Sequence, residues 1–305
     1  MNTLLFAFPG CGALADGLSK GLAAAVGGID WHRFPDGESL ITLRGDCAGR
    51  DVVFVTTLRE PDRLALPLLF ASRTARALGA RSVGLVAPYL AYMRQDALFE
   101  PGQAVSSVHF GAFLSWMFDW AVTVDPHLHR HHELGPLFGG RAEAVSSVPL
   151  VAAWVRSHVA DPVLIGPDEE SAQWLRPLGE LTQAPVVLLG KERHGDRDVQ
   201  VSALSHASIA GRTPVLFDDI VSTGQTMLQT VVRLRDAGAR APVCVGIHGV
   251  FAGDAERWLR VAGAAAIVTT NTIEHATNAI DVAPALLPAI ARRLQAYEPL
   301  SRASS

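Results

Sequence analysis

Short apolar runs alternate with longer helical stretches along the whole sequence. The runs are rich in Val, Ile, Leu and Phe, as at 51–58 (DVVFVTTL), 82–90 (SVGLVAPYL) and 214–220 (PVLFDDI). Strands that are buried on both faces give continuous apolar runs of this kind, and helical connections between them imply parallel pairing. The stretches between the runs, such as 64–80 and 226–239, have the length and pattern of helices. This order of elements predicts an α/β fold.

The two halves of the sequence are similar to each other. In each half a helical stretch ends in Gly-Ala-Arg just before an apolar run, with Gly79 and Gly238 where a glycine at a helix C-terminus is expected. We therefore predict two similar doubly wound, parallel-sheet halves. The expected domains are 1–145 and 146–298, followed by a polar tail at 299–305.

Composition limits the function more than it defines it. The chain has 305 residues, 49% hydrophobic and 18% charged, which is enough apolar material for a large core and too little charge for a disordered chain. The net charge of -4 gives no electrostatic reason to bind nucleic acid or an anionic membrane. Anionic small molecules remain possible ligands because a local site can be positive.

The cysteines and the N-terminus bear on location. Three cysteines stand far apart without metal-ligand spacing, which favours free thiols in a reducing compartment. The first 17 residues lack a basic leading region and are interrupted by Pro9-Gly10, so they do not resemble a signal peptide. No apolar run reaches the roughly 18 residues of a membrane span. We expect a cytoplasmic protein with no membrane contact.

The stretch 215–227 (VLFDDIVSTGQTM) holds the most informative polar residues. An apolar strand runs into Asp218 and Asp219, and the loop Ser-Thr-Gly-Gln-Thr at 222–226 then leads into a helix. Backbone N–H groups, hydroxyls and a helix N-terminus together form a phosphate cradle. The two carboxylates would repel a phosphate unless the ligand also carried hydroxyls or a metal, as a sugar phosphate does. The alternative is a helix N-cap with surplus acids. A Walker loop is excluded, because the sequence has no GxxxxGK[ST].

This loop resembles the phosphoribosyl diphosphate motif of type I phosphoribosyltransferases and of ribose-phosphate diphosphokinases, the PRPP synthetases. Further segments resemble the diphosphokinases in order: RFPDGES at 33–39, PYLAYMRQD at 88–96, VTVDPHLH at 122–129, GPD at 166–168, GKERHGDRDV at 190–199, IHGVFAG at 247–253 and VTTNTI at 268–273. The likeness covers nearly the whole chain, whereas simple phosphoribosyltransferases lack the first half. The segment ALFEPGQAVSS at 97–107 is closest to the archaeal type.

The resemblance implies roles for individual residues. ATP contacts are expected at Phe34, Asp36, Gly37, Glu38, Arg94, Gln95 and Asp96. Ribose-phosphate contacts are expected at Asp218, Asp219, Ser222, Thr223, Gly224, Gln225 and Thr226. Metal contacts are expected at His127 and Asp168, with Asp125 less favoured, and catalysis at Lys191 and Arg193. His129, His131 and His132 are more simply interpreted as solvated loop residues.

The implied reaction transfers the diphosphoryl group of ATP to the anomeric hydroxyl of ribose 5-phosphate, with Mg²⁺ as the cofactor. Two cations at 191 and 193, placed beside ATP, would stabilise the negative charge of the transferring group. The family also implies a homo-oligomer, because its ATP loop can reach a neighbouring subunit. No nucleic acid or membrane partner is implied.

Three other functions stay open. A non-catalytic regulatory homologue would keep the nucleotide and sugar-phosphate contacts, although such proteins usually lose the catalytic loop that is present at 190–199. A phosphoribosyltransferase would act on a base. A metal-dependent hydrolase would use the HxH pattern of His127 and His129, but it needs further ligands at later strand ends.

Three sites depart from the family pattern. Ser222 stands where common synthetases have an aspartate, and we interpret it as a difference between branches of the family. Gln225 stands where common members have a glycine, and a side chain there costs about 1 kcal/mol if the position requires a positive φ. Glu170-Ser171 likewise replaces a Gly-Gly and puts a close backbone approach to the sugar in question.

Overall fold

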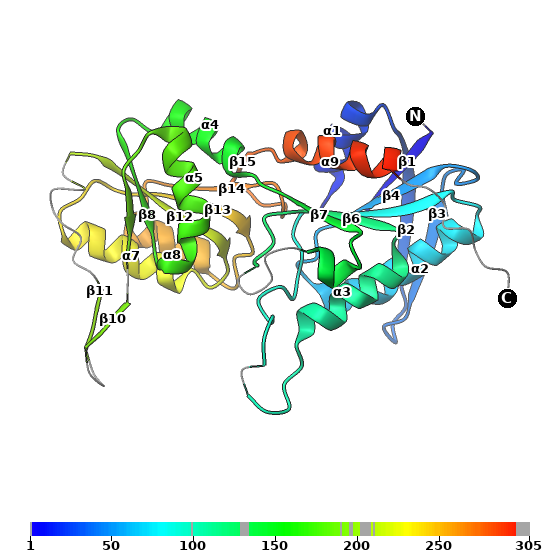
Figure 1. Ribbon diagram of the computed structural model, residues 1–305, viewed down its shortest axis with the longest axis horizontal. Coiled ribbons are helices and arrows are strands. Elements are labelled where there is room, and N and C mark those ends of the chain that lie inside the picture. The colour runs from blue at the N-terminus through cyan, green and yellow to red at the C-terminus, as the bar shows by residue number, and fades with distance from the viewer. Residues whose placement is uncertain are drawn as a thin grey trace. The chain divides into compact units, whose positions relative to one another are not determined.

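The computed structural model describes residues 2–98, 100–128, 134–189, 191–194, 198–201, 209 and 211–296, with the backbone alone at 191–194 and 198–201. It divides into two compact units, 1–145 together with 282–305, and 146–281. Each unit has its own sheet (Figure 1).

The first unit is built on a seven-stranded sheet of order β3-β2-β1-β4-β5-β6-β7. The strands are β1 (Thr3–Ala7), β2 (Ala25–Arg33), β3 (Ser39–Arg44), β4 (Asp51–Val55), β5 (Ser82–Ala87), β6 (Trp120–Val124) and β7 (Ala142–Val145). All neighbours pair in parallel except β2 and β3, which form an antiparallel hairpin. Strands β4, β5 and β6 are buried along their whole length, as their continuous apolar runs predict.

The helices of the first unit are α1 (Gly12–Leu22), α2 (Pro61–Ala77), α3 (Ser106–Met117), the short η1 (Gly135–Phe138) and α9 (Ala283–Ala296). Helix α9 contacts α1, β6 and β7, and Figure 1 shows it beside α1. The missing side chain of Gly21 makes this packing possible, because a Cβ there would lie 2.5 Å from Leu287 Cδ1. The expected C-terminal domain of 146–298 included this helix, so the structure differs from the expectation at 282–296.

The second unit is built on a six-stranded parallel sheet of order β15-β14-β13-β12-β8-β9. Its strands are β8 (Pro162–Gly166), β9 (Val186–Leu188), β12 (Thr213–Val221), β13 (Val243–Gly249), β14 (Ala266–Thr270) and β15 (Asn278–Ile280). Its helices are α4 (Val148–His158), η2 (Glu169–Ser171), α5 (Ala172–Thr182), α7 (Gln225–Asp236) and α8 (Ala255–Ala262). A separate antiparallel hairpin joins β10 (Lys191–His194) and β11 (Asp198–Val201).

The strand orders confirm the predicted fold of two doubly wound, mainly parallel sheets. In the second unit the chain goes from β8 to β9 on one side and to β12, β13 and β14 on the other. The order of strands therefore reverses between β8 and β12. Ligands of open α/β sheets bind at such a switch point, outside the carboxyl ends of the strands. Among the described residues, no helix is long and apolar enough to cross a membrane.

Candidate functional site

Three carboxylates gather at the switch point of the second unit. Strands β8 and β12 are paired up to Ile165 and Leu216, and three residues beyond these come Asp168 and Asp219. Asp219 is buried with only 4% of its surface exposed, while Asp218 is partly exposed. The sequence assigns Asp218 and Asp219 to the ribose-phosphate site and Asp168 to the metal site, and in the structure the three residues lie near one another.

The pKa of Asp218 shows how close these charges are. Burial raises this pKa well above its ordinary value, and the negative charges of Asp219 and then Asp168 raise it further. Such a cluster of acids is unfavourable in the free protein. It becomes favourable when a ligand supplies hydroxyl donors or positive charge, which is why perturbed carboxylates mark functional sites.

Asp168 is held by the turn that follows it. Its Oδ1 accepts hydrogen bonds from the backbone N–H groups of Glu170 (3.0 Å) and Ser171 (3.2 Å). The Ser171 hydroxyl turns back and donates to the Asp168 carbonyl at 2.6 Å. Gly166 leaves room for this hydroxyl, since a Cβ there would lie 2.1 Å from Ser171 Oγ. The serine that replaces a family glycine is therefore buried and takes part in orienting Asp168.

The carboxylate of Asp168 fits a divalent metal that binds together with a substrate. Among the described residues, no three His, Cys, Asp or Glu side chains could hold an ion by themselves. Mg²⁺ is usually bound by only one or two carboxylates together with substrate phosphates and water. Asp168 suits that role because both hydrogen bonds described for its side chain end on Oδ1.

The loop after β12 has the geometry expected of a phosphate cradle. Gly224 adopts φ 67°, and α7 begins directly after it at Gln225 with no acidic residue in its first turn and no side-chain cap. Thr223, Gln225 and Thr226 are exposed at this end, and Ser222 is partly exposed. The N-terminus of α7 therefore presents main-chain N–H groups to an anion.

Gln225 does not carry the strain that its sequence position suggested. The positive φ of this loop belongs to Gly224, and Gln225 is not among the residues with positive φ. Gln225 therefore does not incur the free-energy cost of a positive φ. Gly224 is the residue at the position where the backbone requires a glycine.

The first ATP segment forms the turn of the β2–β3 hairpin. The Phe34 N–H donates to Glu38 O (2.8 Å), the Gly37 N–H donates to Phe34 O (2.9 Å), and Gly37 has φ 93°. Asp36 Oδ1 accepts from the Glu38 N–H at 3.1 Å. The Phe34 side chain remains 40% exposed, with its ring 4.6 Å from that of His32. The hairpin thus presents an aromatic ring and two carboxylates to the outside.

A cavity of about 460 Å³ lies beside this turn. It is lined by Gly37 and Glu38 and by Asp62, Arg63 and Phe70 of α2, among others. None of the lining residues comes from the second ATP segment at 94–96. This cavity therefore contacts the first predicted ATP segment and not the second.

The second ATP segment follows β5. Arg94 and Gln95 are exposed, whereas Asp96 is buried, with 7% of its surface exposed. The Gln95 carbonyl accepts from the Ser107 N–H (3.2 Å), which ties the segment to the start of α3. Asp96 is thus less exposed than its two neighbours, and its contact with ATP stays a prediction.

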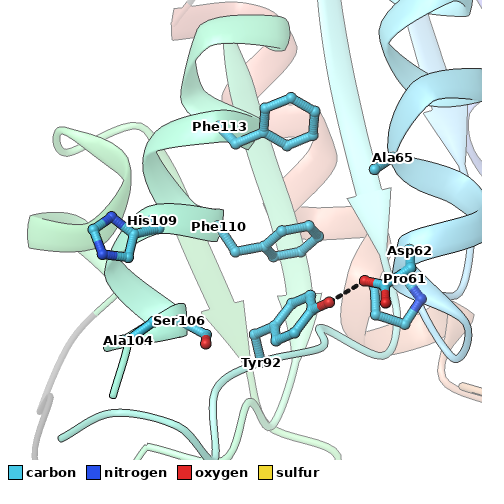
Figure 2. Close-up of a pocket in the computed structure, with 9 residues that line it drawn as sticks. All are labelled: Pro61, Asp62, Ala65, Tyr92, Ala104, Ser106, His109, Phe110 and Phe113. Atoms are coloured by element: carbon cyan, nitrogen blue, oxygen red, sulfur yellow. Dashed lines mark hydrogen bonds between the residues drawn. The ribbon is translucent and has the colours of Figure 1, made fainter. Parts of the chain in front are cut away.

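Tyr92 introduces this segment in a left-handed conformation with φ 67°. Figure 2 shows its ring beside Phe110 in a pocket of about 330 Å³, with its hydroxyl directed at Asp62. Sequence reasoning did not select Tyr92 or Asp62. Nothing in the sequence indicates that a tyrosine has positive φ, and the two residues are 30 positions apart.

His127 and Asp125 lie at the carboxyl end of β6. His127 is partly exposed, and Asp125 is buried with φ 32° and donates its N–H to Val145 O at 2.9 Å. His127 is thus accessible to a ligand, as a metal contact requires. His129, His131 and His132 lie outside the described residues.

Lys191 and Arg193 lie on β10, where they pair with Val201 and Val199 of β11. The described residues of the predicted catalytic stretch at 190–199 thus belong to two antiparallel strands. Both side chains lie outside the described part of the chain, so their catalytic role stays a prediction.

Comparison with known proteins gives one consistent result. Residues 3–115 match the family model of the N-terminal domain of ribose phosphate pyrophosphokinase, and residues 146–285 match that of the phosphoribosyl transferase domain. A ribose-phosphate pyrophosphokinase of Halobacterium salinarum is 34% identical over 286 residues, which cover 92% of this chain and 99% of that protein. One from Sulfurisphaera tokodaii is 30% identical over 282 residues, covering 92% and 96%.

A solved structure resembles the whole fold. The phosphoribosylpyrophosphate synthetase of Mycobacterium smegmatis superimposes with a TM-score of 0.83 and covers 97% of this chain and 99% of that one. At 23% identity this likeness supports the fold alone.

Proposed function

The chain belongs to the ribose-phosphate pyrophosphokinase family, and we propose which of its residues transfer the diphosphoryl group of ATP to the anomeric hydroxyl of ribose 5-phosphate. Pyrophosphokinase is another name for the diphosphokinases that the sequence resembles. The reaction makes 5-phosphoribosyl 1-diphosphate and AMP.

The sugar-phosphate site is assigned from one observation: two carboxylates at a switch point lead directly into a loop that ends at the uncapped N-terminus of α7. We assign the 5-phosphate to the main-chain N–H groups and hydroxyls of 222–226. The ribose hydroxyls donate to Asp218 and Asp219. This arrangement lowers the repulsion among the carboxylates, because each hydroxyl hydrogen bond stabilises a negative charge.

ATP is assigned to the first unit. The exposed ring of Phe34 suits a purine face, and the exposed guanidinium of Arg94 suits phosphate oxygens or the same purine. The proposed nucleotide contacts are completed by Asp36, Gly37, Glu38, Gln95 and Asp96.

Enzymes of this family generally need a divalent metal, and we propose Mg²⁺. Asp168 and His127 are the proposed contacts, as the family resemblance implies. Bound metal would offset the negative charge of the phosphates during transfer. Lys191 and Arg193 would stabilise the charge that develops on the diphosphoryl group as the anomeric oxygen attacks the β-phosphorus and AMP leaves.

A homo-oligomer is also proposed, because the first unit leaves large apolar side chains exposed. These include Phe34 (40% exposed), Leu40 (50%), Leu66 (58%) and Phe70 (40%), which come from the β2–β3 hairpin and α2. Helix α2 and β3 contact each other, so exposed apolar side chains lie on neighbouring elements, and contiguous apolar surface marks a protein contact. Light scattering coupled to size exclusion measures the assembly, and a monomer at micromolar concentration contradicts this part of the proposal.

One assay tests the function. The purified chain is incubated with ATP, MgCl₂ and ribose 5-phosphate, and AMP and 5-phosphoribosyl 1-diphosphate are quantified by chromatography. We expect the two products in equal amounts and no AMP when ribose 5-phosphate is omitted. Formation of ADP, or no nucleotide product in spite of ribose 5-phosphate binding, contradicts the proposal. The second result indicates a non-catalytic homologue.

A further inference from the structure

The loop that follows β13 supports the beginning of the phosphate cradle. The backbone N–H of Phe251 donates to Val221 O at 2.9 Å, and that of Ala252 donates to Ser222 O at 3.1 Å. Val221 and Ser222 are the last residue of β12 and the first of the cradle loop. The position of the cradle thus depends on two consecutive hydrogen bonds from one short segment.

These two bonds also set the direction of the N–H groups in the cradle. In a planar trans peptide the C=O of one residue and the N–H of the next point in opposite directions. Since the carbonyls of Val221 and Ser222 point toward the 251–252 segment, the N–H groups of Ser222 and Thr223 point away from it. Among the described residues, neither of these N–H groups has a backbone acceptor. These two N–H groups are therefore available to a ligand, because the carbonyls of the same peptide groups accept hydrogen bonds from Phe251 and Ala252.

Phe251 holds this donor segment in an unusual conformation. Its φ is 42°, a left-handed value that residues with a side chain seldom adopt outside turns or strained sites. Its side chain is only 6% exposed and belongs to the apolar core that also contains Val221, Met227 and Leu259. Burial of the ring thus offsets an unfavourable backbone.

Two neighbours fix the Phe251 ring. Gly249 leaves room for the ring, because a Cβ at Gly249 would lie 2.7 Å from Phe251 Cε2. The other contact is His275, whose ring centroid is 4.5 Å away. His275 is itself held by Thr277 Oγ1 at 3.0 Å from its Nδ1. The ring therefore lies against the carboxyl end of β13 and the loop between β14 and β15, and the donor segment cannot shift without displacing it.

We propose that Phe251 is a positioning residue for the ribose 5-phosphate site, which acts through its backbone N–H on Val221 and through its buried ring. It touches no substrate. This inference rests on the proposed assignment of the cradle to the 5-phosphate. Phe251 thus contributes to the affinity of this site for a phosphorylated sugar, and it has no role in ATP binding.

The test is ribose 5-phosphate binding by the full chain, measured by calorimetry without ATP, for wild type, Phe251→Ala and Gly249→Ala. We expect both variants to raise the dissociation constant at least tenfold, because one removes the ring and the other displaces it. Leu234→Ala is the matched control: Leu234 is fully buried in the same core, but it lies ten residues from Gly224 at the far end of α7. This control should lower the melting temperature comparably and change the dissociation constant less than threefold.

Steady-state kinetics give the second readout. In Phe251→Ala we expect the KM for ribose 5-phosphate to rise at least tenfold and the KM for ATP to change less than threefold. If the alanine variant does not fold, Phe251→Leu keeps most of the apolar volume, and its dissociation constant should rise about threefold or more.

The outcomes separate this inference from the proposed function. Unchanged ribose 5-phosphate affinity in the folded Phe251 and Gly249 variants overturns the positioning role, while an active wild type keeps the function. An equal loss of affinity in Leu234→Ala also overturns it, because the effect would then be one of general stability. If the wild type binds ribose 5-phosphate but forms no product, the function fails, and a selective loss of binding in Phe251→Ala still supports the positioning role. If the wild type does not bind ribose 5-phosphate, both fail.

Discussion

The Tyr92 hydroxyl donates a hydrogen bond to Oδ1 of Asp62, which joins the segment after β5 to the first turn of α2 (Figure 2). This hydrogen bond is the main reason that the pKa of Tyr92 is raised to about 12; partial burial and the negative charge of Asp62 add to it. The pair fixes the residue two positions before Arg94, in a backbone conformation with positive φ.

The first prediction is that Asp62→Ala moves the pKa of Tyr92 back toward the ordinary tyrosine value of about 10. Because the folded pKa is the higher one, the contribution of this pair to stability is complete below pH 10 and is lost as the pH rises through about 12. Ultraviolet titration of the phenolate measures the change, and Tyr92→Phe identifies which of the three tyrosines is responsible. An Asp62→Ala titration that matches wild type would contradict the assignment.

Much of the site could be predicted because its parts are local in sequence. Asp218, Asp219 and the loop at 222–226 follow one apolar strand, so finding the strand also locates the cradle. Asp168 joins them because parallel strands place their carboxyl ends at one edge of a sheet, and β8 is the neighbour of β12.

The remaining features depend on contacts that no local pattern encodes. Helix α9 returns to the first unit through contacts with α1, although it follows the second unit directly in sequence. Phe251 has positive φ because Gly249 and His275 surround its ring, and a phenylalanine in a sequence does not indicate such a backbone. The sequence suggests a strained backbone at Gln225, but in the structure Gly224, the residue before it, has the positive φ.

The second prediction is that Lys191→Ala lowers kcat by 100-fold or more, about 3 kcal/mol of transition-state stabilisation. The reason is the loss of a fixed positive charge beside the transferring diphosphoryl group. Lys20, the other lysine of the sequence, is exposed on α1 and gives the matched control Lys20→Ala, which should leave kcat within twofold. The measurement is AMP formation at saturating ATP and ribose 5-phosphate, and an unchanged rate in Lys191→Ala would refute its role.

The third prediction concerns Asp218→Asn, which should stabilise the ligand-free protein and weaken ribose 5-phosphate binding. Burial and two nearby carboxylates raise the pKa of Asp218, so its contribution to stability is present at acid pH and is lost as the pH rises through that raised value. Asparagine avoids this loss, and we expect a gain of about 1 kcal/mol at pH 8, roughly 2–4 °C in Tm for a domain of this size.

Thermal unfolding between pH 4 and pH 8 measures this effect, and the gain should shrink toward acid pH, where wild-type Asp218 is protonated. Asp16→Asn, at an exposed position on α1, is the control and should show no such gain. Calorimetry should show at least tenfold weaker ribose 5-phosphate binding for Asp218→Asn, because the amide is a poorer acceptor than a carboxylate. A lower Tm for Asp218→Asn at pH 8 would contradict the prediction.

The fourth prediction is that His127→Ala raises the Mg²⁺ concentration needed for half-maximal activity by about tenfold, a typical result of weakening a metal site. The control is His158→Ala, at an exposed histidine of α4 that stacks on Trp154 at 4.6 Å; it precedes the first residue of β8, whereas Asp168 follows the carboxyl end of that strand. Activity is measured over a series of Mg²⁺ concentrations after treatment with a chelator. The same Mg²⁺ dependence in His127→Ala and wild type would remove His127 from the proposed site.

The fifth prediction distinguishes the effects of Gly224 and Gln225 on ribose 5-phosphate affinity. Gly224→Ala puts a Cβ on a backbone with φ 67°, which costs about 1 kcal/mol. The cost comes from the backbone and not from a clash, because the new Cβ would lie 3.6 Å from Ala255 Cβ, an ordinary contact distance. The loop relieves this strain by leaving the cradle conformation, and we expect ribose 5-phosphate to bind about five- to tenfold more weakly.

Gln225→Gly is the matched substitution in the opposite direction. Gln225 begins α7 without a positive φ, so glycine has no strain to relieve there and should change ribose 5-phosphate affinity less than threefold. Calorimetry on both variants, without ATP, decides between the positions. If Gln225→Gly binds the sugar phosphate much more tightly than wild type, the glutamine itself restricts the pocket. The family glycine at that position would then serve access to the phosphate rather than backbone geometry.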